Sequence, residues 1–379
     1  MARAASPKKR KMSLDRNTAS LQPVVWCLLG RKAGDNTQVL ALAEALGWPF
    51  ERKTILARSW ELLPHLLLGS TLLGIDRTSS SPLTPPWPDL VISAGRRNEP
   101  VARWIKHQSG GKTRLVHIGR PWAPLECYDL IVSTPQYFLD PRANVLINPL
   151  PMHQFTRATV DRAAAELAPQ FAHLSRPFTA VLIGGDSGPF VFTPDKGRHL
   201  AKGVNRLLRQ TGGTALVSGS PRTPRAVAEA VVATLDVPAQ TYWWHDRDTK
   251  APNPYATYLG LADRFVVTGE SMSMLAEAAS LDRPLYLFDP GDPQGGWWSH
   301  PHNLRPKPLS HALAMRFAPR RMRRDISRIQ AALVRDNLAR WLSEAPNLIA
   351  QGETWTEKMR SDLSGGAQHA AVRIRALFS

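Results

Sequence analysis

The sequence lacks the features that mark several common classes of protein. Among its 379 residues there are only two cysteines, Cys27 and Cys127, too few and too far apart for a disulfide framework or a zinc site. No run reaches the roughly 18 apolar residues that a membrane span needs. No apolar segment of the kind found in signal peptides follows the basic N-terminus. We therefore expect a soluble protein of a reducing compartment, the cytoplasm. Any contact with a membrane would be peripheral, on the inner face of that membrane.

Two nucleotide-binding motifs are also missing. No G-x-x-x-x-G-K-[ST] loop is present, which excludes a P-loop GTPase or ATPase. A dehydrogenase or epimerase that uses NAD needs G-x-G-x-x-G after its first strand, and the spacing of Gly30 and Gly34 does not fit. Acids and histidines lack metal-ligand spacing, apart from the isolated pair Asp246 and Asp248. We predict no metal and no cofactor.

Acidic residues are few beside basic ones. The 31 Asp and Glu residues face 48 Lys and Arg residues, which gives a net charge of +17. Such a surplus favours an anionic partner: nucleic acid, lipid headgroups or a phosphorylated substrate. Basic residues gather before residue 18 and over 316–324, where a solvated tail and a solvated helix face are equally good explanations. Without a nucleic-acid motif, we expect an anionic membrane surface or a lipid-linked acceptor.

One leucine-rich stretch remains open to two interpretations. Residues 62–75 are the most apolar part of the chain, but Pro64, His65, Gly69 and Ser70 interrupt them. The stretch is either a core helix or a patch that lies in the plane of a membrane.

Apolar strand-like runs alternate with helical patterns, which predicts a mostly parallel α/β fold. The predicted strands cover 24–29, 90–93, 114–118, 130–133, 145–147, 179–183, 214–217, 241–244, 265–268 and 285–288. The predicted helices cover 38–46, 100–107, 160–167, 196–210, 224–235, 255–262 and 272–280. Two such series predict two Rossmann-like domains that face each other across a cleft. The predicted divisions are a disordered basic tail (1–20), an acceptor domain (21–172), a donor domain (173–303) and a basic helical segment that packs back on both (304–379).

The most informative motif is TGESMSMLAEA at 268–278. A strand runs into a tight turn at Gly269, and a helix is predicted to start at Ser271. The free N–H groups and positive dipole end of that helix would bind an anion, with help from the Ser271 and Ser273 hydroxyls. Glu277 would accept hydrogen bonds from ribose hydroxyls. The alternative is an ordinary strand–turn–helix with Ser271 as N-cap and Glu277 in solvent.

Two further Gly/Ser turns follow predicted strands in the second half, at 184–188 and 218–224. Glycines at 184 and 185 allow a ligand to approach the backbone, and Arg222 would clamp a diphosphate. Each turn alone is explained as a tight turn, but three at neighbouring strand ends favour a ligand site. The predicted donor-binding residues are Gly184, Gly185, Ser187, Ser218, Ser220, Arg222, Glu270, Ser271, Met272, Ser273 and Glu277.

The first half carries polar strand ends as well. Asp35 lies in the loop after the first strand and is our candidate catalytic base, although a helix N-cap is an equally good interpretation. His117 ends a later strand and is either a site residue or a core histidine, which is the more common case. The predicted acceptor-binding or anion-binding residues are Asn36, Thr37, Arg96, Arg97, Asn98 and His117.

Residues 266–286 resemble the donor-site segment of GT-B glycosyltransferases, the class that includes the N-acetylglucosaminyltransferase forming lipid II. This resemblance implies diphosphate binding at Ser271, Met272 and Ser273 and ribose binding at Glu277, with Met272 and Met274 where small residues or Thr are usual. The set GDNTQ, GRRNEP, HIGRP, IGGDSG, SGSPRT and TGESMSMLAEA is similar to the mitochondrial-fission ELM family over about residues 24–300.

Together the two resemblances imply a metal-independent glycosyltransferase. It would move a sugar from a nucleoside-diphosphate donor to a membrane-associated acceptor, and the nucleotide sugar would be a substrate and not a cofactor. The alternative is a non-catalytic adaptor of the same fold that acts at a membrane surface, as the fission role of the family suggests.

Overall fold

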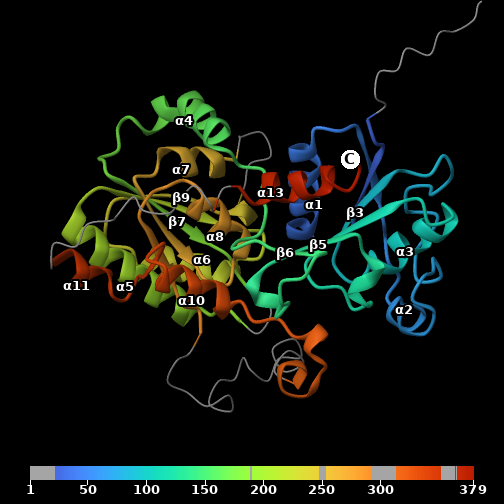
Figure 1. Ribbon diagram of the computed structural model, residues 1–379. Coiled ribbons are helices and arrows are strands. Elements are labelled where there is room, and N and C mark those ends of the chain that lie inside the picture. The colour runs from blue at the N-terminus through green and yellow to red at the C-terminus, as the bar shows by residue number, and fades with distance from the viewer. Residues whose placement is uncertain (1–21, 188–189, 247–252, 292–312, 351–362, 364) are drawn as a thin grey trace, which may run out of the picture.

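The protein is built from two six-stranded parallel sheets that lie side by side, each with helices on both faces (Figure 1). The computed structural model describes residues 22–187, 190–246, 253–291, 313–350, 363 and 365–379. The predicted α/β class is confirmed, and so are the positions of the ten predicted strands. In the described part of the chain, no helix combines the length and the apolar character needed to cross a membrane.

The first sheet has the strand order β2-β1-β3-β4-β5-β6. Its first five strands follow the 2-1-3-4-5 order of doubly wound, flavodoxin-like folds. The strands are β1 (Val25–Leu29), β2 (Phe50–Thr54), β3 (Leu90–Ala94), β4 (Arg114–Ile118), β5 (Leu130–Ser133) and β6 (Val145–Ile147). The order reverses direction between β1 and β3, so the carboxyl ends of these two strands are where a ligand is expected.

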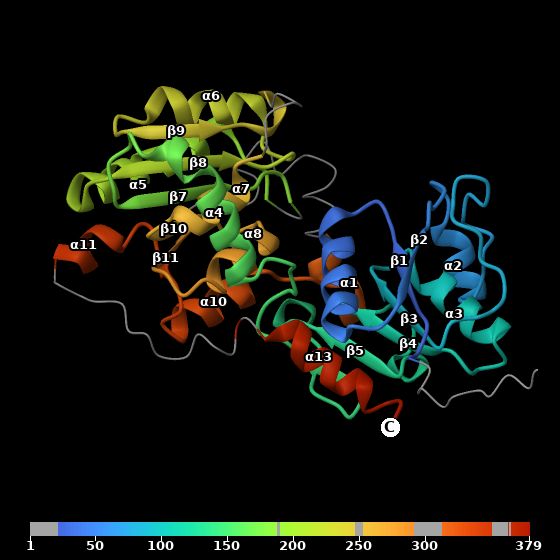
Figure 2. The same cartoon turned by 90° about the horizontal axis from the view of Figure 1, so that it is seen from above.

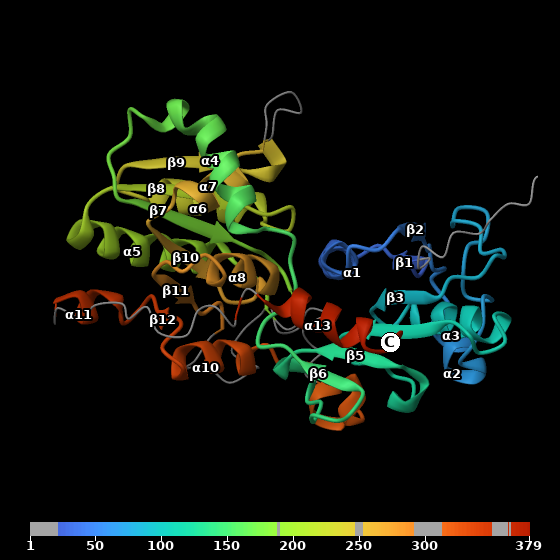
Figure 3. The ribbon, with the colours of Figure 1, turned by 45° about the horizontal axis from the view of Figure 1, so that its top comes forward.

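Helices cover both faces of this first sheet. On one face lie α1 (Ala33–Leu46) and, from the far end of the chain, α13 (Gly366–Arg375), which packs against α1 (Figure 2). On the other lies α3 (Glu99–Gln108), with α2 (Leu62–Leu68) beside it (Figure 3). Both faces are covered, so the strands read as continuous apolar runs.

The second sheet has the order β12-β11-β10-β7-β8-β9. Numbered from β7, this is the 3-2-1-4-5-6 order of the Rossmann fold, and it reverses between β7 and β10. The strands are β7 (Phe178–Ile183), β8 (Thr214–Gly219), β9 (Ala239–Tyr242), β10 (Arg264–Thr268), β11 (Leu285–Phe288) and β12 (Arg340–Trp341).

Alternate side chains of β7 enter the two cores of this sheet. Val181 and Ile183 pack under α5 (Pro194–Thr211) and α6 (Arg225–Thr234). Ala180 and Leu182 pack on the opposite face, with the helices α4 (Arg157–Phe171), α7 (Tyr255–Leu261), α8 (Met272–Ala279) and α10 (Ser327–Arg335). A short helix, α11 (Ala345–Ala350), lies beside α5.

Three features differ from the sequence-based expectation. The first helix begins at Ala33 and not at residue 38. The helix α4, placed with the first unit by the predicted boundary at 172, packs on α7, where Thr257 Oγ1 donates to the Ala163 carbonyl at 3.0 Å. Strands β2 and β12 were not predicted. Because β12 lies in it, the C-terminal segment that was expected to be helical also contains a strand.

Candidate functional site

The residues predicted to bind the donor gather where the second sheet reverses direction. The glycines at 184 and 185 follow β7, and the segment 269–271 follows β10, its neighbour in the sheet. Ligands of open α/β sheets bind at the carboxyl ends of strands at such a point. The topology therefore brings two of the three predicted donor turns together, and the third follows β8 next to β7.

A buried carboxylate joins the first two of these turns. Glu270 is 1% exposed, and its Oε1 accepts hydrogen bonds from the Gly185 N–H at 2.8 Å and from Thr268 Oγ1 at 2.9 Å. Thr268 Oγ1 in turn accepts from the Gly184 N–H at 2.8 Å. Burial raises the pKa of the Glu270 carboxyl. Its Oε2 has no hydrogen-bond partner among the described residues, so one oxygen remains for a ligand.

The two glycines are required by packing as much as by any ligand. A Cβ on Gly184 would clash with Glu270, and a Cβ on Gly185 would clash with the backbone carbonyl of Arg222. We therefore expect Gly185→Ala to lower the free energy of unfolding by about 2 kcal/mol, because backbone must move to admit the methyl group. The control is Gly30→Ala, where the nearest atom to the new Cβ is 3.6 Å away. Urea unfolding of both variants checks this, and equal losses in the two would contradict it.

The turn after β8 divides into structural residues and one available cation. Ser220 Oγ donates to the Gly184 carbonyl at 2.8 Å, and Thr223 Oγ1 donates to the Ile183 carbonyl at 3.0 Å, so both tie β8 to β7. Ser218 lies within β8 and is 2% exposed. The exposed Arg222 donates to the Asp186 carbonyl at 3.1 Å, which holds its guanidinium over the loop that follows β7. Ser187, in that loop, exchanges backbone hydrogen bonds with Phe190.

The start of α8 meets the start of α1 from the other unit. Ser271 is the N-cap residue of α8, is 4% exposed and makes no side-chain capping bond. The first N–H groups of a helix have no partner within the helix and attract anions. A Cβ on Gly34, in the first turn of α1, would lie 3.4 Å from Ser273 Oγ. Two helix N-termini therefore converge where the two units touch.

The carboxylate of Glu277 is not in solvent, so this part of the alternative interpretation of residues 268–278 is wrong, whereas Ser271 is the N-cap residue as that interpretation has it. The residue is 6% exposed, and its Oε2 accepts a hydrogen bond from the Tyr255 hydroxyl. Burial raises the pKa of Glu277 to about 7, and the bond from Tyr255 acts in the opposite direction. Tyr255 packs on Phe155, from the connection between the units, with ring centroids 5.8 Å apart. A carboxyl of this kind changes charge near neutral pH.

In the first unit, Asp35 lies on the sheet's ligand-binding edge. It stands in the first turn of α1, whose N-cap is Lys32, so the interpretation of Asp35 as N-cap is wrong. Its carboxylate approaches Gly95 at the end of β3, where φ is +73° and a Cβ would lie 2.6 Å from Oδ2. Among the described residues Asp35 has no hydrogen-bond or ion-pair partner. A partly buried, unpaired carboxylate at this edge is suited to accept a proton.

Two asparagines predicted to bind the acceptor instead hold the end of β1. Asn36 accepts from the Gly30 N–H and donates to the Gly30 carbonyl, both at 2.8 Å. Asn98 donates from Nδ2 to the Leu28 carbonyl at 3.1 Å, while its buried Oδ1 has no partner in the described part of the chain. Thr37 Oγ1 donates to the Ala33 carbonyl at 3.1 Å. Of these side chains, only Asn98 keeps a buried acceptor unpaired.

The two predicted arginines lie together and share one acid. Arg96 Nη2 lies 2.8 Å and Arg97 Nε 3.0 Å from Glu61 Oε1. The Arg96 guanidinium also stacks over Trp122, 5.0 Å from the ring centroid. Arg96 Nη1 is buried and has no hydrogen-bond partner among the described residues, so a donor remains there for an anionic ligand.

His117 is a core residue and not a site residue. It is fully buried, its Nδ1 lies 2.9 Å from Ser93 Oγ, and its ring packs on Tyr128. Burial lowers its pKa to about 3. The ring is therefore neutral and out of reach of an acceptor, which corrects the prediction that it binds one.

Sequence reasoning missed several residues that support this region. Thr268 and Glu61 stand in or near the motifs, but nothing in the sequence shows which groups they contact. Gln330 comes from α10, about 60 residues beyond the motif, and its Nε2 donates to the Gly269 carbonyl at 2.7 Å. A buried glutamine on a C-terminal helix has no sequence signal that links it to this turn.

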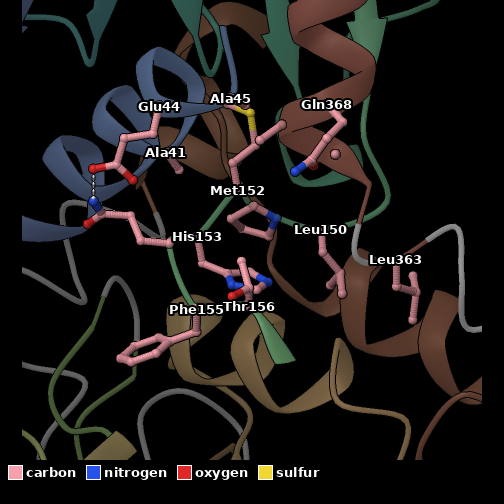
Figure 4. Close-up of a pocket in the computed structure, with 14 residues that line it drawn as sticks. Ala41, Glu44, Ala45, Leu150, Met152, His153, Phe155, Thr156, Leu363 and Gln368 are labelled. Atoms are coloured by element: carbon pink, nitrogen blue, oxygen red, sulfur yellow. Dashed lines mark hydrogen bonds between the residues drawn. The ribbon is translucent and has the colours of Figure 1, made fainter. Parts of the chain in front are cut away.

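A pocket of about 220 Å³ lies apart from the candidate site, near the C-terminal end of α1 (Figure 4). Its walls come from the second half of α1, the connection 150–156 and the start of α13. Glu44 and Gln154 are hydrogen bonded across it at 2.7 Å. Burial lowers the pKa of His153, which lines it. The pocket marks the place where the chain passes between the units, and none of the predicted site residues lines it.

No cluster of three or more His, Cys, Asp or Glu side chains suited to a metal ion occurs within the described ranges. Of the isolated acidic pair noted in the sequence, Asp246 is described, and position 248 lies outside the described ranges. Both cysteines are free thiols.

Comparison with known proteins places this geometry in a family. The family model described as mitochondrial fission ELM1 matches residues 33–358. The chain belongs to this family. An uncharacterized protein of Rickettsia prowazekii is 26% identical over 298 residues, which cover 70% of this chain and 83% of that one. The mitochondrial fission protein ELM1 of Arabidopsis thaliana is 25% identical over 222 residues, which cover 53% of this chain and only 51% of that protein.

Solved structures with a similar arrangement include a glycosyltransferase and an epimerase. A glycosyltransferase from Rickettsia africae is 10% identical with a TM-score of 0.44, covering 94% of this chain and 99% of that one. A UDP-GlcNAc 2-epimerase from Methanocaldococcus jannaschii, in complex with UDP-GlcNAc and UDP, is 11% identical with a TM-score of 0.49, covering 93% and 99%.

Proposed function

We propose that the chain binds a nucleoside-diphosphate sugar at the carboxyl edge of the second sheet and transfers the sugar to a membrane-associated acceptor held by the first. The observation that carries this proposal is the meeting of α1 and α8 at their N-termini, which brings the helix turn that holds the candidate base next to the candidate diphosphate site. The reaction needs no metal in this proposal, and the nucleotide sugar is a substrate.

Each charged residue has a distinct role in this scheme. Glu277, in its ionised form, accepts hydrogen bonds from the ribose hydroxyls. The N-terminus of α8 and Arg222 hold the diphosphate and stabilise the charge that develops as it leaves. Asp35 takes the proton of the acceptor hydroxyl, whose oxygen attacks the anomeric carbon while the bond to the diphosphate breaks. Arg96, through its unpaired Nη1, and the exposed Arg97 bind an anionic acceptor.

A non-catalytic adaptor at a membrane surface is the second candidate, and one observation favours it. Side chains such as Asn36, Asn98 and Ser220 hydrogen bond to strand-end backbone. An adaptor that kept the fold would need them as much as an enzyme would. Their presence at the strand ends therefore does not by itself indicate catalysis.

The donor site is tested by thermal stabilisation of the purified protein with a panel of nucleoside diphosphates and nucleotide sugars. We expect a selective rise in Tm with one nucleotide, and a loss of most of that rise in Arg222→Ala. The matched control is Arg209→Ala, an exposed arginine paired with Asp236 in the same unit, which should respond like the wild type. If no member of the panel raises Tm, the proposed donor site is wrong and the adaptor becomes the favoured function.

A further inference from the structure

The exposed apolar side chains of this protein are concentrated around one helix. Of eleven exposed large apolar residues in the described chain, six fall between residues 60 and 73. They are Trp60 (49% exposed), Leu63 (62%), Leu66 (55%), Leu67 (74%), Leu68 (57%) and Leu73 (61%). We call these six residues the α2 surface. Single exposed leucines are ordinary, whereas a contiguous group marks a site of interaction.

The inner side of α2 is fixed by polar contacts, so the leucines cannot turn inward. His65 is 6% exposed and stacks on Trp122, with ring centroids 6.3 Å apart and planes at 20°. Glu61, the N-cap residue of α2, is held by Arg96 and Arg97. The helix is anchored by its buried polar residues, while the leucines of the α2 surface are exposed. It lies at the edge of the first unit that is remote from the second sheet (Figure 1).

Arginines lie at both ends of this apolar helix. Arg58 is exposed and its guanidinium lies 6.0 Å from the Trp60 ring centroid. At the other end, a Cβ on the C-cap residue Gly69 would lie 2.8 Å from Arg103 Nη1. Glu61 is the acid at the start of the helix, and it is already paired. An apolar centre with cationic ends complements lipid tails and anionic headgroups.

We propose that the α2 surface inserts into the interfacial layer of an anionic membrane. The leucines enter the boundary between headgroups and acyl chains, Trp60 lies at headgroup level, and Arg58 and Arg103 contact lipid phosphates. Of the two interpretations of residues 62–75, this proposal adopts the in-plane patch.

The docking also bears on the acceptor, and in this respect it rests on the proposed function. The same Glu61 that begins α2 is bound by Arg96 and Arg97, which follow β3 at the edge where the acceptor is proposed to bind. A membrane against α2 would therefore lie next to that edge. An acceptor anchored in the bilayer could reach Arg96 and Arg97 without leaving it.

The test is co-sedimentation of the full chain with vesicles of phosphatidylcholine alone or mixed with phosphatidylglycerol. The variant is Leu66→Gln/Leu67→Gln, and the matched control is Val232→Gln/Val372→Gln, two exposed valines on α6 and α13. We expect wild type and control to bind the mixed vesicles, and the α2 variant to bind about tenfold less tightly or worse. Raised salt separates the contributions, because it screens the basic N-terminal tail but not apolar insertion.

Equal vesicle binding by the α2 variant and the control would overturn the proposal, and so would wild-type binding that raised salt abolishes completely. A third contrary outcome is that the wild type binds no vesicles but forms a dimer, and that the substitutions in the α2 variant, unlike those in the control, prevent this dimer. The last would identify a second copy of the chain as the occupant, and light scattering would detect it. The nucleotide-induced rise in Tm, measured on the same α2 variant, keeps this test separate from the proposed function. Vesicle binding without any nucleotide response would leave the α2 proposal standing and remove the donor site.

Discussion

Glu277→Gln is expected to stabilise the protein strongly at pH 8 and by less than about 1 kcal/mol at pH 5. The pKa of Glu277 in the folded protein is raised to about 7, from an ordinary value of 4.5. Between these values the folded state holds a proton that the unfolded chain has released, so stability falls as pH rises through this window. The loss at pH 8 is about 3 kcal/mol. Glutamine does not ionise, and its carbonyl can still accept from Tyr255, so the variant avoids this loss.

Thermal unfolding at both pH values measures this effect. The control is Glu229→Gln on α6, an exposed glutamate whose replacement should leave Tm nearly unchanged at both pH values. A change in Tm of the same size at pH 5 and pH 8 would show that ionisation of Glu277 does not destabilise the fold. The same variant should bind the nucleotide about tenfold less tightly at pH 8, because a neutral amide is a weaker acceptor for ribose hydroxyls than a carboxylate.

A gain in stability with a loss of binding would separate a functional residue from a structural one. A carboxylate kept in a buried place at a cost in stability is typical of binding and catalytic sites. If Glu277→Gln bound nucleotide as tightly as wild type, Glu277 would have no role at the ribose.

Asp35→Asn is expected to lower turnover by about 10²–10⁴-fold and to leave donor binding unchanged. The amide cannot take the proton of an attacking hydroxyl, and general-base catalysis contributes a factor of this size. The assay is release of nucleoside diphosphate from whichever nucleotide sugar stabilises the protein, with water as the slow acceptor. Asp161→Asn on α4, an exposed acid paired with Arg157, is the control. Turnover by Asp35→Asn at the wild-type rate would contradict the role of Asp35, and no release by wild type would favour the adaptor.

Most of the fold could be predicted because its central strands are buried on both faces. Such strands carry unbroken apolar runs, as Leu90–Ala94 does, and these are easy to recognise. Strand β2 is different: Phe50–Thr54 is an edge strand paired only with β1, and most of its side chains are exposed and polar. The two-residue strand β12 is defined by its partner β11 and has no pattern of its own.

The start of α1 shows why a correct recognition of residue types led to a wrong boundary. The sequence predicts that residues 34–37, with Asp35 among them, lie in a loop before a helix that begins at residue 38. In the structure these residues lie inside the helix, and Asn36 caps the end of β1 by bonding both backbone groups of Gly30. Side chains of this kind bond nearby backbone in several ways, and only the tertiary fold decides which.

The candidate site could be located from sequence more easily than its ligands could be assigned. Parallel strands place their carboxyl ends at one edge, so the turns after β7, β8 and β10 had to meet. Which polar atoms remain for a ligand depends on which side chains hydrogen bond to the backbone N–H and C=O groups at the strand ends. Ser220 is used in this way, whereas Glu270 keeps one oxygen unpaired in the described chain. That division is a matter of three-dimensional contact and leaves no mark in residue spacing.

In the proposed function, one ligand binds between the helix starts of α1 and α8 and contacts both units. Amide hydrogen exchange with and without the stabilising nucleotide sugar tests it most directly. We expect protection in 184–187 and 270–274 of the second unit together with protection in 30–36 of the first. Protection confined to the second unit, or protection centred on the pocket at 150–156, would contradict it.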